Sequence, residues 1–512
     1  MINIYEPNIS KYTESSINAI HDGWISNHGK FVELANNKLK EITKSRFSIL
    51  MSNGTCATHC LFLTLKYKYP NIDKIYVPNN CYIAAWNSAL MVYDIDKLEV
   101  MKMNKDTWNV ITNEEYIQTL DKNSAVLIVH NLGNIINVPL LKRIRPDLIF
   151  IEDNCEGMFG KYENIFSGVS ESSLCSSCSF YGNKIITTGE GGAFFTQDES
   201  VYNYIKSIYS QGMSEKRYLH NLHAYNYRMT NIQAGFLYEQ LNDIDKILEN
   251  KYKIFQTYDN LLQELIKLEK IKLIKHEDNT IYAPWIYSLR IVNNKKSIEE
   301  TNDFFRKNNV DTRPFFYPIN SHEHLKFITN NDDTSYIMNK EIIMIPSSPT
   351  ITYEQQRYVV NTIYKFIFNC ENIDVIELSN TNQYDIFQSF LSKINDNKFR
   401  YFNTRSIECL KNHIVTLILH DKKYNKYIGY VHIDFEYKYW LGIYIVDEYQ
   451  NKKLGSLLLQ LILQHEKVYD INEINLTVDI DNKAAIQLYK NLNFKIIETK
   501  NTYHTMKRLN EH

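Results

Sequence analysis

The chain has 512 residues, of which 44% are hydrophobic and 23% charged, as expected of a soluble globular protein with two or three domains. Its formal net charge of -2 gives no electrostatic reason to expect nucleic acid or an anionic membrane surface as a partner. No apolar run is long enough to cross a bilayer, and the N-terminus MINIYEPNISKY lacks the basic and apolar regions of a secretory signal. These features predict a cytoplasmic protein.

Cysteine usage agrees with that location. Most of the eight cysteines lie inside apolar segments and not at the spacings of a disulfide framework. The pair Cys175-x-x-Cys178 has no second pair at the spacing of a zinc site. The sequence therefore predicts free, mostly buried thiols and no metal centre.

The first half of the chain alternates strand-like apolar runs with helical patterns, which predicts an α/β fold with a mostly parallel sheet covered by helices on both faces. The strand-like runs lie at 45–55, 74–80, 124–133 and 147–157. Ligands in such folds bind beyond the carboxyl ends of the strands. The polar clusters at those ends are Asn53-Gly54-Thr55, Pro78-Asn79-Asn80, His130-Asn131 and Asp153-Asn154. We expect them to converge on one site.

The second half contains three further regions. Residues 228–262 keep apolar positions three and four apart, as in a long helical stretch, and 270–369 read as a smaller α+β region that ends in a helix. A new strand-like run then begins in CENIDVIELS. The predicted domains are therefore 1–370 and 374–512.

One lysine has unusual neighbours. Lys184 lies in SSCSFYGNKIITTGEGGAFFT, between a Ser-Phe pair and a glycine-rich turn. A lysine that forms a Schiff base needs an aldehyde, an electron sink and a fixed phosphate, and pyridoxal 5'-phosphate (PLP) supplies all three. The protein must then offer a carboxylate, an aromatic ring and phosphate donors. The candidates are Asp153, Tyr82, the helix start at Gly54 and Thr55, and the Ser179 hydroxyl.

These motifs carry a resemblance. The first 370 residues resemble the DegT/DnrJ/EryC1/StrS family of sugar-nucleotide aminotransferases, which have the fold-type I PLP architecture. The matching stretches, in family order, are SNGT (52–55), PNNCYIAAWNSA (78–89), VHNLGN (129–134), EDNCEGMFGKY (152–162), SFYGNKIITTGEGG (179–192), YNYRMTNIQAG (225–235) and DTRPFFYP (311–318). Within the family, EDNCEG and DTRPFFYP are most similar to perosamine and viosamine synthases, including those of giant viruses.

The resemblance implies a role for each matching residue. Lys184 would bind PLP covalently and move the proton between cofactor and substrate. Asp153 would pair with the pyridine nitrogen, Glu156 would face the phenolic oxygen, and Tyr82 would stack on the ring.

Further matches concern the phosphate and the substrate. Thr55 and Ser179 would hold the phosphate with Asn226 of the partner subunit, so a homodimer would complete the site. Arg228 and Arg313 would lie near the sugar nucleotide.

Other positions leave alternatives open. Gln211-Gly212 and Pro318-Ile319-Asn320 depart from the family pattern near the substrate, so the sugar is not assigned. Relatives with His in place of the lysine are dehydratases, and Lys184 therefore favours transamination. His130 fits a core histidine or a substrate contact equally well. Trp24 and Trp86 are expected to be packing residues.

Residues 374–512 resemble the GNAT N-acetyltransferase fold, with WLGIYIVDEYQNKKLGSLLLQLILQHEK running strand, loop, helix. The resemblance implies that backbone amides of one loop bind the pyrophosphate of acetyl-CoA. That loop consists of Gln450, Asn451, Lys452, Lys453, Leu454, Gly455 and Ser456. Lys453 replaces the first glycine of the family pattern, and a lysine fits there if its φ is negative.

Other matches of this domain concern the acetyl transfer itself. Tyr489 would protonate the leaving thiolate, Asn482 matches the preceding asparagine, and Ile445 and Val446 would pair with the pantetheine arm. The alternating His432, Asp434 and Glu436 share one strand face, where each is either a general base or a solvated side chain. Residues 400–406 are a candidate acceptor lining.

Together the two domains predict a bifunctional enzyme. Glutamate would donate an amino group to a nucleotide-linked 4-keto-6-deoxyhexose, and acetyl-CoA would acetylate the new amine, with UDP- or dTDP-N-acetylviosamine as the leading product. The alternatives are a perosamine-type GDP-sugar, a different acyl donor or acceptor, and a degenerate GNAT domain that serves binding or dimerisation. The nucleotide and the configuration at C4 stay open.

Overall fold

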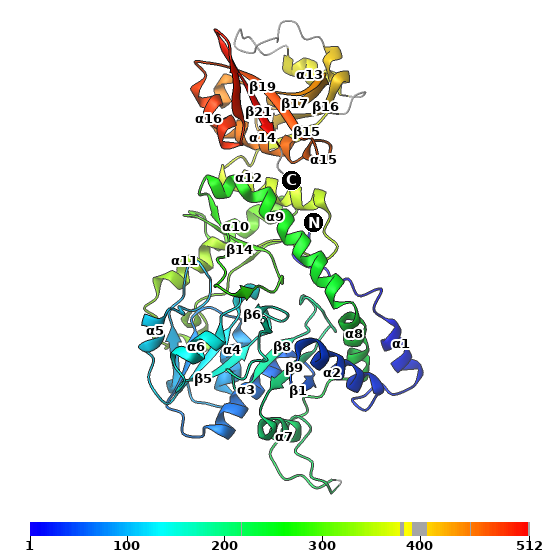
Figure 1. Cartoon of the computed structure of the whole chain (residues 1–512), viewed down its shortest axis with the longest axis vertical. Coiled ribbons are helices and arrows are strands. Elements are labelled where there is room, and N and C mark those ends of the chain that lie inside the picture. The colour runs from blue at the N-terminus through cyan, green and yellow to red at the C-terminus, as the bar shows by residue number, and fades with distance from the viewer. Residues whose placement is uncertain (217, 379–382, 392–406, 451, 510–512) are drawn as a thin grey trace. The chain divides into compact units, whose positions relative to one another are not determined.

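The computed structural model of the chain describes every residue except 217, 379–382, 392–406, 451 and 510–512 (Figure 1). By their internal contacts the residues form two compact units. The first comprises residues 1–258 and 271–356, and the second comprises 259–270 and 357–512. The second unit thus begins before the 370–374 boundary expected from sequence and includes the end of helix α9 (Ile244–Lys267).

The first unit is built on a mostly parallel sheet, as predicted. Its strand order is β1-β9-β8-β5-β4-β2-β3. These strands are β1 (Phe47–Met51), β2 (Lys74–Pro78), β3 (Leu98–Met101), β4 (Ser124–Val129), β5 (Ile149–Asp153), β8 (Ser176–Ser179) and β9 (Gly192–Thr196). Strand β9 runs antiparallel to both of its neighbours, β1 and β8. The glycine-rich turn after Lys184 therefore leads into a strand that lies between β1 and β8.

Helices cover both faces of this sheet (Figure 1). One face packs against α3 (Gly54–Lys68), α4 (Ile83–Leu90) and α7 (Glu199–Ile208). The other packs against α2 (Lys30–Thr43), α6 (Val138–Ile144) and α8 (Asn231–Asn242). In β4, Leu127 joins one core and its neighbours Val126 and Ile128 join the other. A strand buried on both faces reads as a continuous apolar run, which is why the sequence reveals it.

A smaller α+β part completes the first unit. Its sheet has the order β10-β12-β14-β13. The elements are β10 (Ile271–Lys272), β12 (Ser288–Ile291), β13 (Arg313–Pro314), β14 (Ile342–Met344), α10 (Ile298–Lys307) and α11 (Asp333–Glu341). The predicted long helical stretch is two helices, because α8 ends at Asn242 and α9 starts at Ile244. Thr230 and Gln233 form a capping box at the start of α8.

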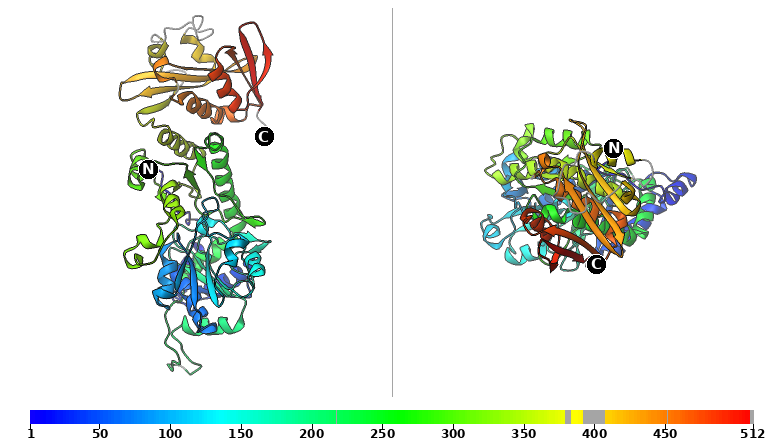
Figure 2. Two further views of the ribbon diagram at one scale, coloured as in Figure 1. Left: turned by 90° about the vertical axis from the view of Figure 1, so that its left-hand side faces the viewer. Right: turned by 90° about the horizontal axis from the view of Figure 1, so that it is seen from above.

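The second unit is a mixed sheet with helices (Figure 2). Its strand order is β15-β16-β17-β18-β19-β21-β20. The strands are β15 (Ile373–Glu377), β16 (His413–Asp421), β17 (Lys426–Glu436), β18 (Lys438–Ile445), β19 (Glu473–Asp479), β20 (Lys495–Thr499) and β21 (Tyr503–Leu509). The helices include α12 (Tyr353–Ile367), α13 (Tyr384–Leu391), α14 (Leu454–Leu463) and α16 (Lys483–Asn491). Strand β18 is parallel to β19 and antiparallel to β17.

Side-chain burial tests several expectations. All eight cysteines are free thiols, and five of them are buried. Trp86 is fully buried, as expected of a packing residue, but the packing prediction for Trp24 is wrong because this side chain is 62% exposed. No helix among the described residues has the length and apolarity of a membrane span.

Candidate active sites

Polar residues at the carboxyl ends of the central strands meet as predicted. The Asn131 amide donates to the Asn80 carbonyl over 2.9 Å, which ties the end of β4 to the end of β2. The Leu132 N–H donates to the Glu156 carboxylate over 2.8 Å, which ties the end of β4 to the loop after β5. Three polar strand ends therefore form one region.

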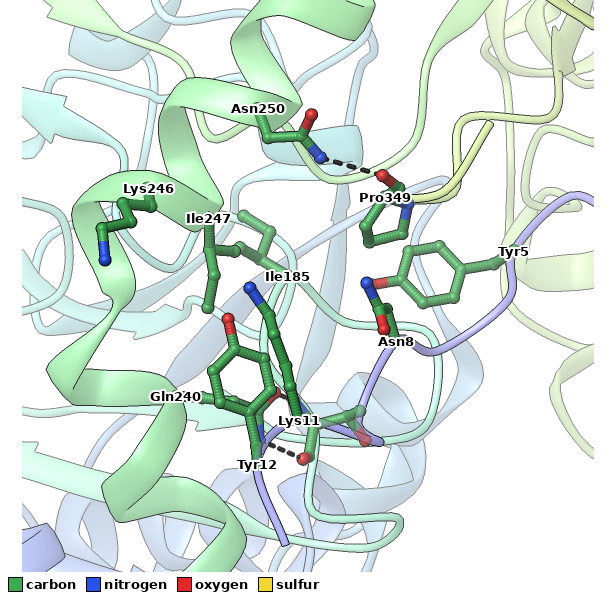
Figure 3. A pocket seen from close by; sticks show the side chains of 11 residues that line it. Tyr5, Asn8, Lys11, Tyr12, Ile185, Gln240, Lys246, Ile247, Asn250 and Pro349 are labelled. Carbon is green, nitrogen blue, oxygen red and sulfur yellow. Dashed lines mark hydrogen bonds between the residues drawn. The ribbon is translucent and has the colours of Figure 1, made fainter. Parts of the chain in front are cut away.

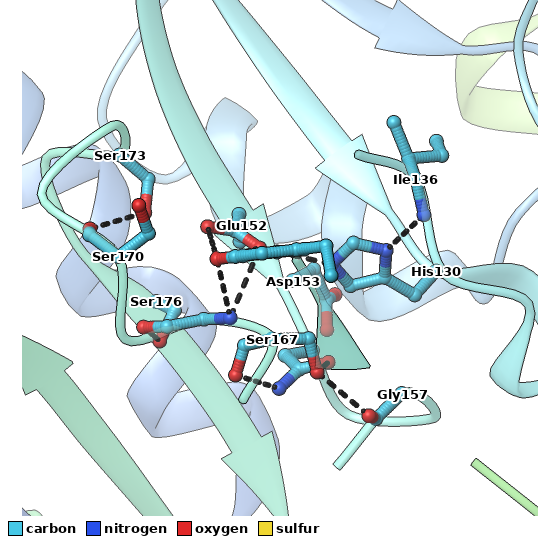
Figure 4. A network of polar contacts seen from close by, with 12 residues as sticks. His130, Ile136, Glu152, Asp153, Gly157, Ser167, Ser170, Ser173 and Ser176 are labelled. Atoms are coloured by element: carbon cyan, nitrogen blue, oxygen red, sulfur yellow. Dashed lines mark hydrogen bonds and ion pairs between the residues drawn. The ribbon is translucent and has the colours of Figure 1, made fainter. Parts of the chain in front are cut away.

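His130 belongs to the core below this region (Figure 4). The Ile136 N–H donates to Nδ1, so the proton of the neutral ring lies on Nε2, which donates to the Glu152 carboxylate over 2.9 Å. Tyr162 and the Gly168 N–H also donate to Glu152. His130 and Glu152 are fully buried. The core interpretation of His130 is the one that the structure supports.

Lys184 lines a small cavity together with two other predicted site residues. Glu156 and Ser179 line the same cavity, as does Trp285, whose ring centroid lies 3.9 Å from the Lys184 Nζ. Asp153 is buried at the end of β5, and its Oδ1 accepts the Cys155 N–H over 3.1 Å. Asp153 does not line the cavity itself, but Glu156 interacts electrostatically with both Lys184 and Asp153, so the three groups lie near one another.

The start of α3 forms a cradle beside Ser179. The Asn53 side chain caps the helix by accepting the Cys56 N–H, and Gly54 is the first helical residue. A Cβ on Gly54 would lie 2.7 Å from the Cβ of Ser179, so only glycine lets the helix start approach that hydroxyl. Thr55 follows in the first turn. Helix amides beside two hydroxyls fit a phosphate group.

The remaining predicted residues of this unit lie further apart. Tyr82 is 58% exposed, and its ring meets Phe316 edge to face at 6.3 Å. Arg228 pairs with Met51 in an isolated bridge and donates to Asn226 over 3.0 Å. Arg313 is exposed and forms an ion pair with Asp311. These contacts assign Arg228 to the neighbourhood of β1 and leave Arg313 on the surface.

Glu156 is a titratable group of this cavity. Burial raises the pKa of its carboxyl to about 7, while the nearby Lys184 ammonium acts in the opposite direction. Near neutral pH the side chain therefore exists in both protonation states. Its protonated form can donate a hydrogen bond, as a glutamine would.

The pH dependence of stability tests this environment. Between pH 4.5 and about 7 the folded cofactor-free protein binds more protons at Glu156 than the unfolded chain does, so stability falls as pH rises through that window. We expect the Glu156 carboxyl to lower the free energy of unfolding by about 3 kcal/mol across this pH window. Glu156→Gln should remove that part of the slope in denaturant unfolding from pH 4 to 8. An unchanged slope would contradict the raised pKa.

The second unit has the strand separation expected of its predicted cofactor cleft. Strands β18 and β19 pair at Tyr439–Ile474 and Trp440–Asn475, and β18 continues to Ile445 beyond these pairs. The Val446 N–H donates to the Ile428 carbonyl on β17. Gln450 donates to the Ile445 carbonyl over 3.1 Å, which fixes the loop against the end of β18.

The predicted pyrophosphate loop differs from expectation at one residue. Lys453 has φ +62°, a left-handed conformation, so the condition under which a lysine fits this position, a negative φ, is not met. Glycine adopts left-handed backbone angles without an energetic cost, whereas a lysine pays a steric cost there because of its Cβ. The Ser456 hydroxyl contacts the carboxyl of Glu264, whose pKa burial raises to about 7. Asn451 lies outside the described residues.

The other candidates of this unit occupy defined positions. Asn482 caps α16 by accepting the Ala485 N–H over 3.1 Å. Tyr489 is buried on the same helix, and burial raises the pKa of its phenol. His432 is fully buried and stacks on His413, with ring centroids 4.0 Å apart.

The carboxylates that follow His432 on β17 are more accessible. Asp434 lies 3.5 Å from the His432 ring nitrogen, and Glu436 is exposed. Ligand atoms of His413, His432 and Asp434 lie within 4.8 Å of one another, a grouping that suits a cation and that the sequence did not predict. The candidate acceptor segment 400–406 lies outside the described residues.

Sequence reasoning missed Trp285, Lys251 and Glu264. Trp285 lies in the smaller α+β part, about a hundred residues from Lys184, so no local motif connects them. Lys251 and Glu264 are charged positions on the otherwise amphipathic α9. A charged residue on the apolar stripe of such a helix is the one signal that the sequence offers.

At the strand ends of an α/β sheet, Lys184 and two buried carboxylates lie beside a helix start that fits a phosphate group, an arrangement that suits a cofactor-dependent enzyme. Residues 8–364 match the DegT/DnrJ/EryC1/StrS aminotransferase family, and the chain belongs to that family. Residues 382–494 match the acetyltransferase (GNAT) family. The chain therefore combines a PLP-dependent sugar aminotransferase domain with a GNAT acetyltransferase domain.

Individual relatives cover the first part of the chain. GDP-perosamine synthase of Vibrio cholerae is 29% identical over 387 residues, which span 72% of this chain and all of the relative. The enzyme of the same name from Escherichia coli O157:H7 is 27% identical over 369 residues, 71% of this chain and 98% of the relative.

Solved structures share the fold of this part. The PLP form of a sugar aminotransferase, Spr1654 of Streptococcus pneumoniae, has a TM-score of 0.63 at 18% identity and covers 71% of this chain and 98% of its own. A GDP-4-keto-6-deoxymannose-3-dehydratase mutant with bound GDP-perosamine also has a TM-score of 0.63 at 18% identity, with 71% and 100% covered.

Proposed function

We propose that the chain transaminates a nucleotide-linked 4-keto-6-deoxyhexose at C4, with glutamate as amino donor, and then N-acetylates the new amine with acetyl-CoA. The observation that carries the first half is the meeting of Lys184, Glu156 and Ser179 in one cavity beside the buried Asp153. The product would be a nucleotide-linked 4-acetamido-4,6-dideoxyhexose.

The residues of the first site suit this chemistry. PLP supplies the aldehyde and the electron sink when bound. Lys184 carries the reactive amine, and Asp153 offers a negative charge to the pyridine nitrogen. Thr55, Ser179 and the amides at the start of α3 offer phosphate donors.

Further residues would complete the first site. Glu156, which lines the cavity with Lys184, would exchange a hydrogen bond with the phenolic oxygen, and the exposed Tyr82 ring would stack on the cofactor. A homodimer would add Asn226 of the partner subunit. The role proposed for Arg228 and Arg313 is contact with the sugar nucleotide.

The relatives support one nucleotide as the first to test. Proteins 27% and 29% identical to this chain are named GDP-perosamine synthases, and a protein of the same fold is described with bound GDP-perosamine. These names support a GDP-linked sugar as the first substrate to test. UDP- and dTDP-linked sugars, which would lead to N-acetylviosamine, form the second arm of the same panel.

The second site supports the acetylation step. The pairing of β18 with β19 stops at Trp440–Asn475, short of Ile445 and Val446, which supports a place for a pantetheine arm beside this end of β18. Gln450 holds the predicted pyrophosphate loop against the same end of the strand. Tyr489 is the proposed proton donor to the thiolate. His432, Asp434 and Glu436 are the candidate bases.

An alternative for the second unit is a binding module without acetyl transfer. Its motivating observation is the left-handed Lys453 at the pyrophosphate loop. Titration of the full-length chain with acetyl-CoA tests this point directly. Saturable binding without acetylation of any 4-amino sugar nucleotide would favour the alternative.

The removal of the Tyr489 hydroxyl separates the two halves of the proposal. We expect Tyr489→Phe to slow acetylation by about 10²-fold, because general acid catalysis typically contributes 10²- to 10⁴-fold, and to leave transamination unchanged. The measurement supplies a 4-amino sugar nucleotide and acetyl-CoA to the full chain. Tyr503→Phe, on β21, is the matched control. Equal rates for Tyr489→Phe and wild type would remove Tyr489 from the mechanism.

A further inference from the structure

Lys184 rests on a side chain from a distant part of the first unit. The indole ring of Trp285 lies under the Lys184 Nζ at 3.9 Å, a distance at which the ring face attracts an ammonium group. The Trp285 Nε1–H donates to the Asn183 carbonyl over 2.8 Å. One indole therefore holds both the backbone before Lys184 and the end of its side chain.

The backbone of Trp285 is itself fixed from two sides. The Ala283 N–H donates to the Gly133 carbonyl over 2.8 Å, and a Cβ on Gly133 would lie 2.0 Å from the Ala283 oxygen. Gly133 also has φ +81°, so a glycine is required there. From the other side, the Lys251 Nζ on α9 donates to the Trp285 carbonyl over 2.8 Å and to the Ser347 carbonyl over 2.6 Å.

Burying the amine of Lys251 in an apolar core costs free energy of folding. Its side chain is fully buried, its acceptors are these two backbone carbonyls, and burial lowers the pKa of its amine to about 7. The rings of Tyr5 and Phe255 lie 5.5 Å from its Nζ. Tyr5 in turn donates to the Lys184 carbonyl over 2.6 Å. Lys251 thus contacts two groups that both touch the Lys184 segment.

Another pocket lies next to the residue that follows Lys184 (Figure 3). The residues that line this pocket include Tyr5 of the N-terminal segment, Ile185, which directly follows Lys184, and Asn250 of α9. The Asn250 side chain donates to the Pro349 carbonyl. The N-terminal segment, α9 and the loop after Lys184 therefore meet here.

We propose that Trp285 and Lys251 are positioning residues that place the Lys184 amine at the wall of the cofactor cavity before the cofactor binds. Trp285 sets the position of the amine, and Lys251 sets the position of Trp285. This inference rests on the proposed role of Lys184. A misplacement of about 1 Å can cost on the order of a hundredfold in rate, so the effect on cofactor capture is measurable.

The test follows covalent capture of PLP by the cofactor-free, full-length protein. The Lys184 nitrogen bonds to the aldehyde carbon and the carbonyl oxygen leaves as water; borohydride then makes the bond permanent, and mass spectrometry locates it. We expect Trp285→Leu to slow capture roughly ten- to a hundredfold and Trp285→Phe, which keeps a ring face, to slow it less. Lys251→Met should also slow capture, roughly tenfold or more.

Two controls separate positioning from stability. Tyr258→Phe removes another buried hydrogen bond between α9 and the same segment, from the Tyr258 hydroxyl to the Pro346 carbonyl over 2.5 Å. Lys253→Met changes an exposed lysine of α9. Both should capture PLP at the wild-type rate.

The outcomes are distinguishable. Equal slowing by Lys251→Met and Tyr258→Phe, or wild-type capture by Trp285→Leu, would overturn the inference. If Lys251→Met does not fold, the order of the two Trp285 variants decides. Capture by Lys184→Ala at the wild-type rate would instead overturn the proposed function of Lys184.

Discussion

Replacement of Lys184 by alanine is expected to lower the transamination rate on the order of 10⁴-fold or more while leaving the second reaction intact. In the proposed mechanism the lysine amine would both bind the cofactor and move the proton, so its removal would take away nucleophile and base together. The rate of 4-amino sugar formation from glutamate and the 4-keto sugar nucleotide is the measurement. Acetylation of a supplied 4-amino sugar nucleotide should continue at the wild-type rate.

Two further variants make this result specific. Lys184→Arg keeps a cation beside Trp285 but has no amine that can form the covalent bond, so it should be as inactive as the alanine variant. Lys206→Ala changes an exposed lysine on α7 and should be fully active. Transamination by Lys184→Arg near the wild-type rate would mean that the cation, and not the amine, is what the reaction needs.

Replacement of Asp153 by asparagine should lower transamination by about 10²- to 10³-fold, the range found when one fixed electrostatic group of an active site is removed. Asp153 is buried at the end of β5, where its charge can keep the pyridine nitrogen protonated. Asparagine has nearly the same shape and can still accept the Cys155 N–H, so the fold should survive.

The steady-state rate and the absorption spectrum of bound PLP report this change. The matched control is Asp147→Asn, just before the start of β5, whose exposed carboxylate is ion-paired with the buried Arg145. It should leave the rate unchanged. An Asp153→Asn enzyme with wild-type activity would show that the carboxylate is not the partner of the ring nitrogen.

The elements around the first site were predictable because local patterns determine them. The continuous apolar runs of β4 and β5 arise from burial on both faces, and the polar residues that follow mark the strand ends. Gly54 was readable as a helix start next to a capping asparagine. The meeting of Lys184 with Glu156 was predicted from the family pattern, and the structure places both in one cavity.

Other features depend on contacts that no local pattern encodes. His130 fitted two interpretations until the Ile136 N–H and Glu152 occupied both of its ring nitrogens. Trp24 was expected to pack in the core because tryptophan is a large apolar residue, but it is exposed in the single chain. The left-handed Lys453 departs from the preference of an L residue, so propensity predicts the wrong sign of φ.

The role of α9 is a further example of non-local information. Its apolar stripe predicts an amphipathic helix. The stripe does not reveal that Lys251 donates to the carbonyl of Trp285 or that the Glu264 carboxyl contacts the Ser456 hydroxyl. Both contacts join segments far apart in sequence. Such contacts need the fold before they can be named.

The central claim is that one chain performs both reactions in sequence, and a single mass-spectrometric assay tests it most directly. The full-length protein is incubated with PLP, glutamate and a panel of GDP-, UDP- and dTDP-linked 4-keto-6-deoxyhexoses, with and without acetyl-CoA. The account predicts a 4-amino sugar nucleotide without acetyl-CoA and a 4-acetamido sugar nucleotide with it, for at least one member of the panel. The absence of both products across the panel would contradict it.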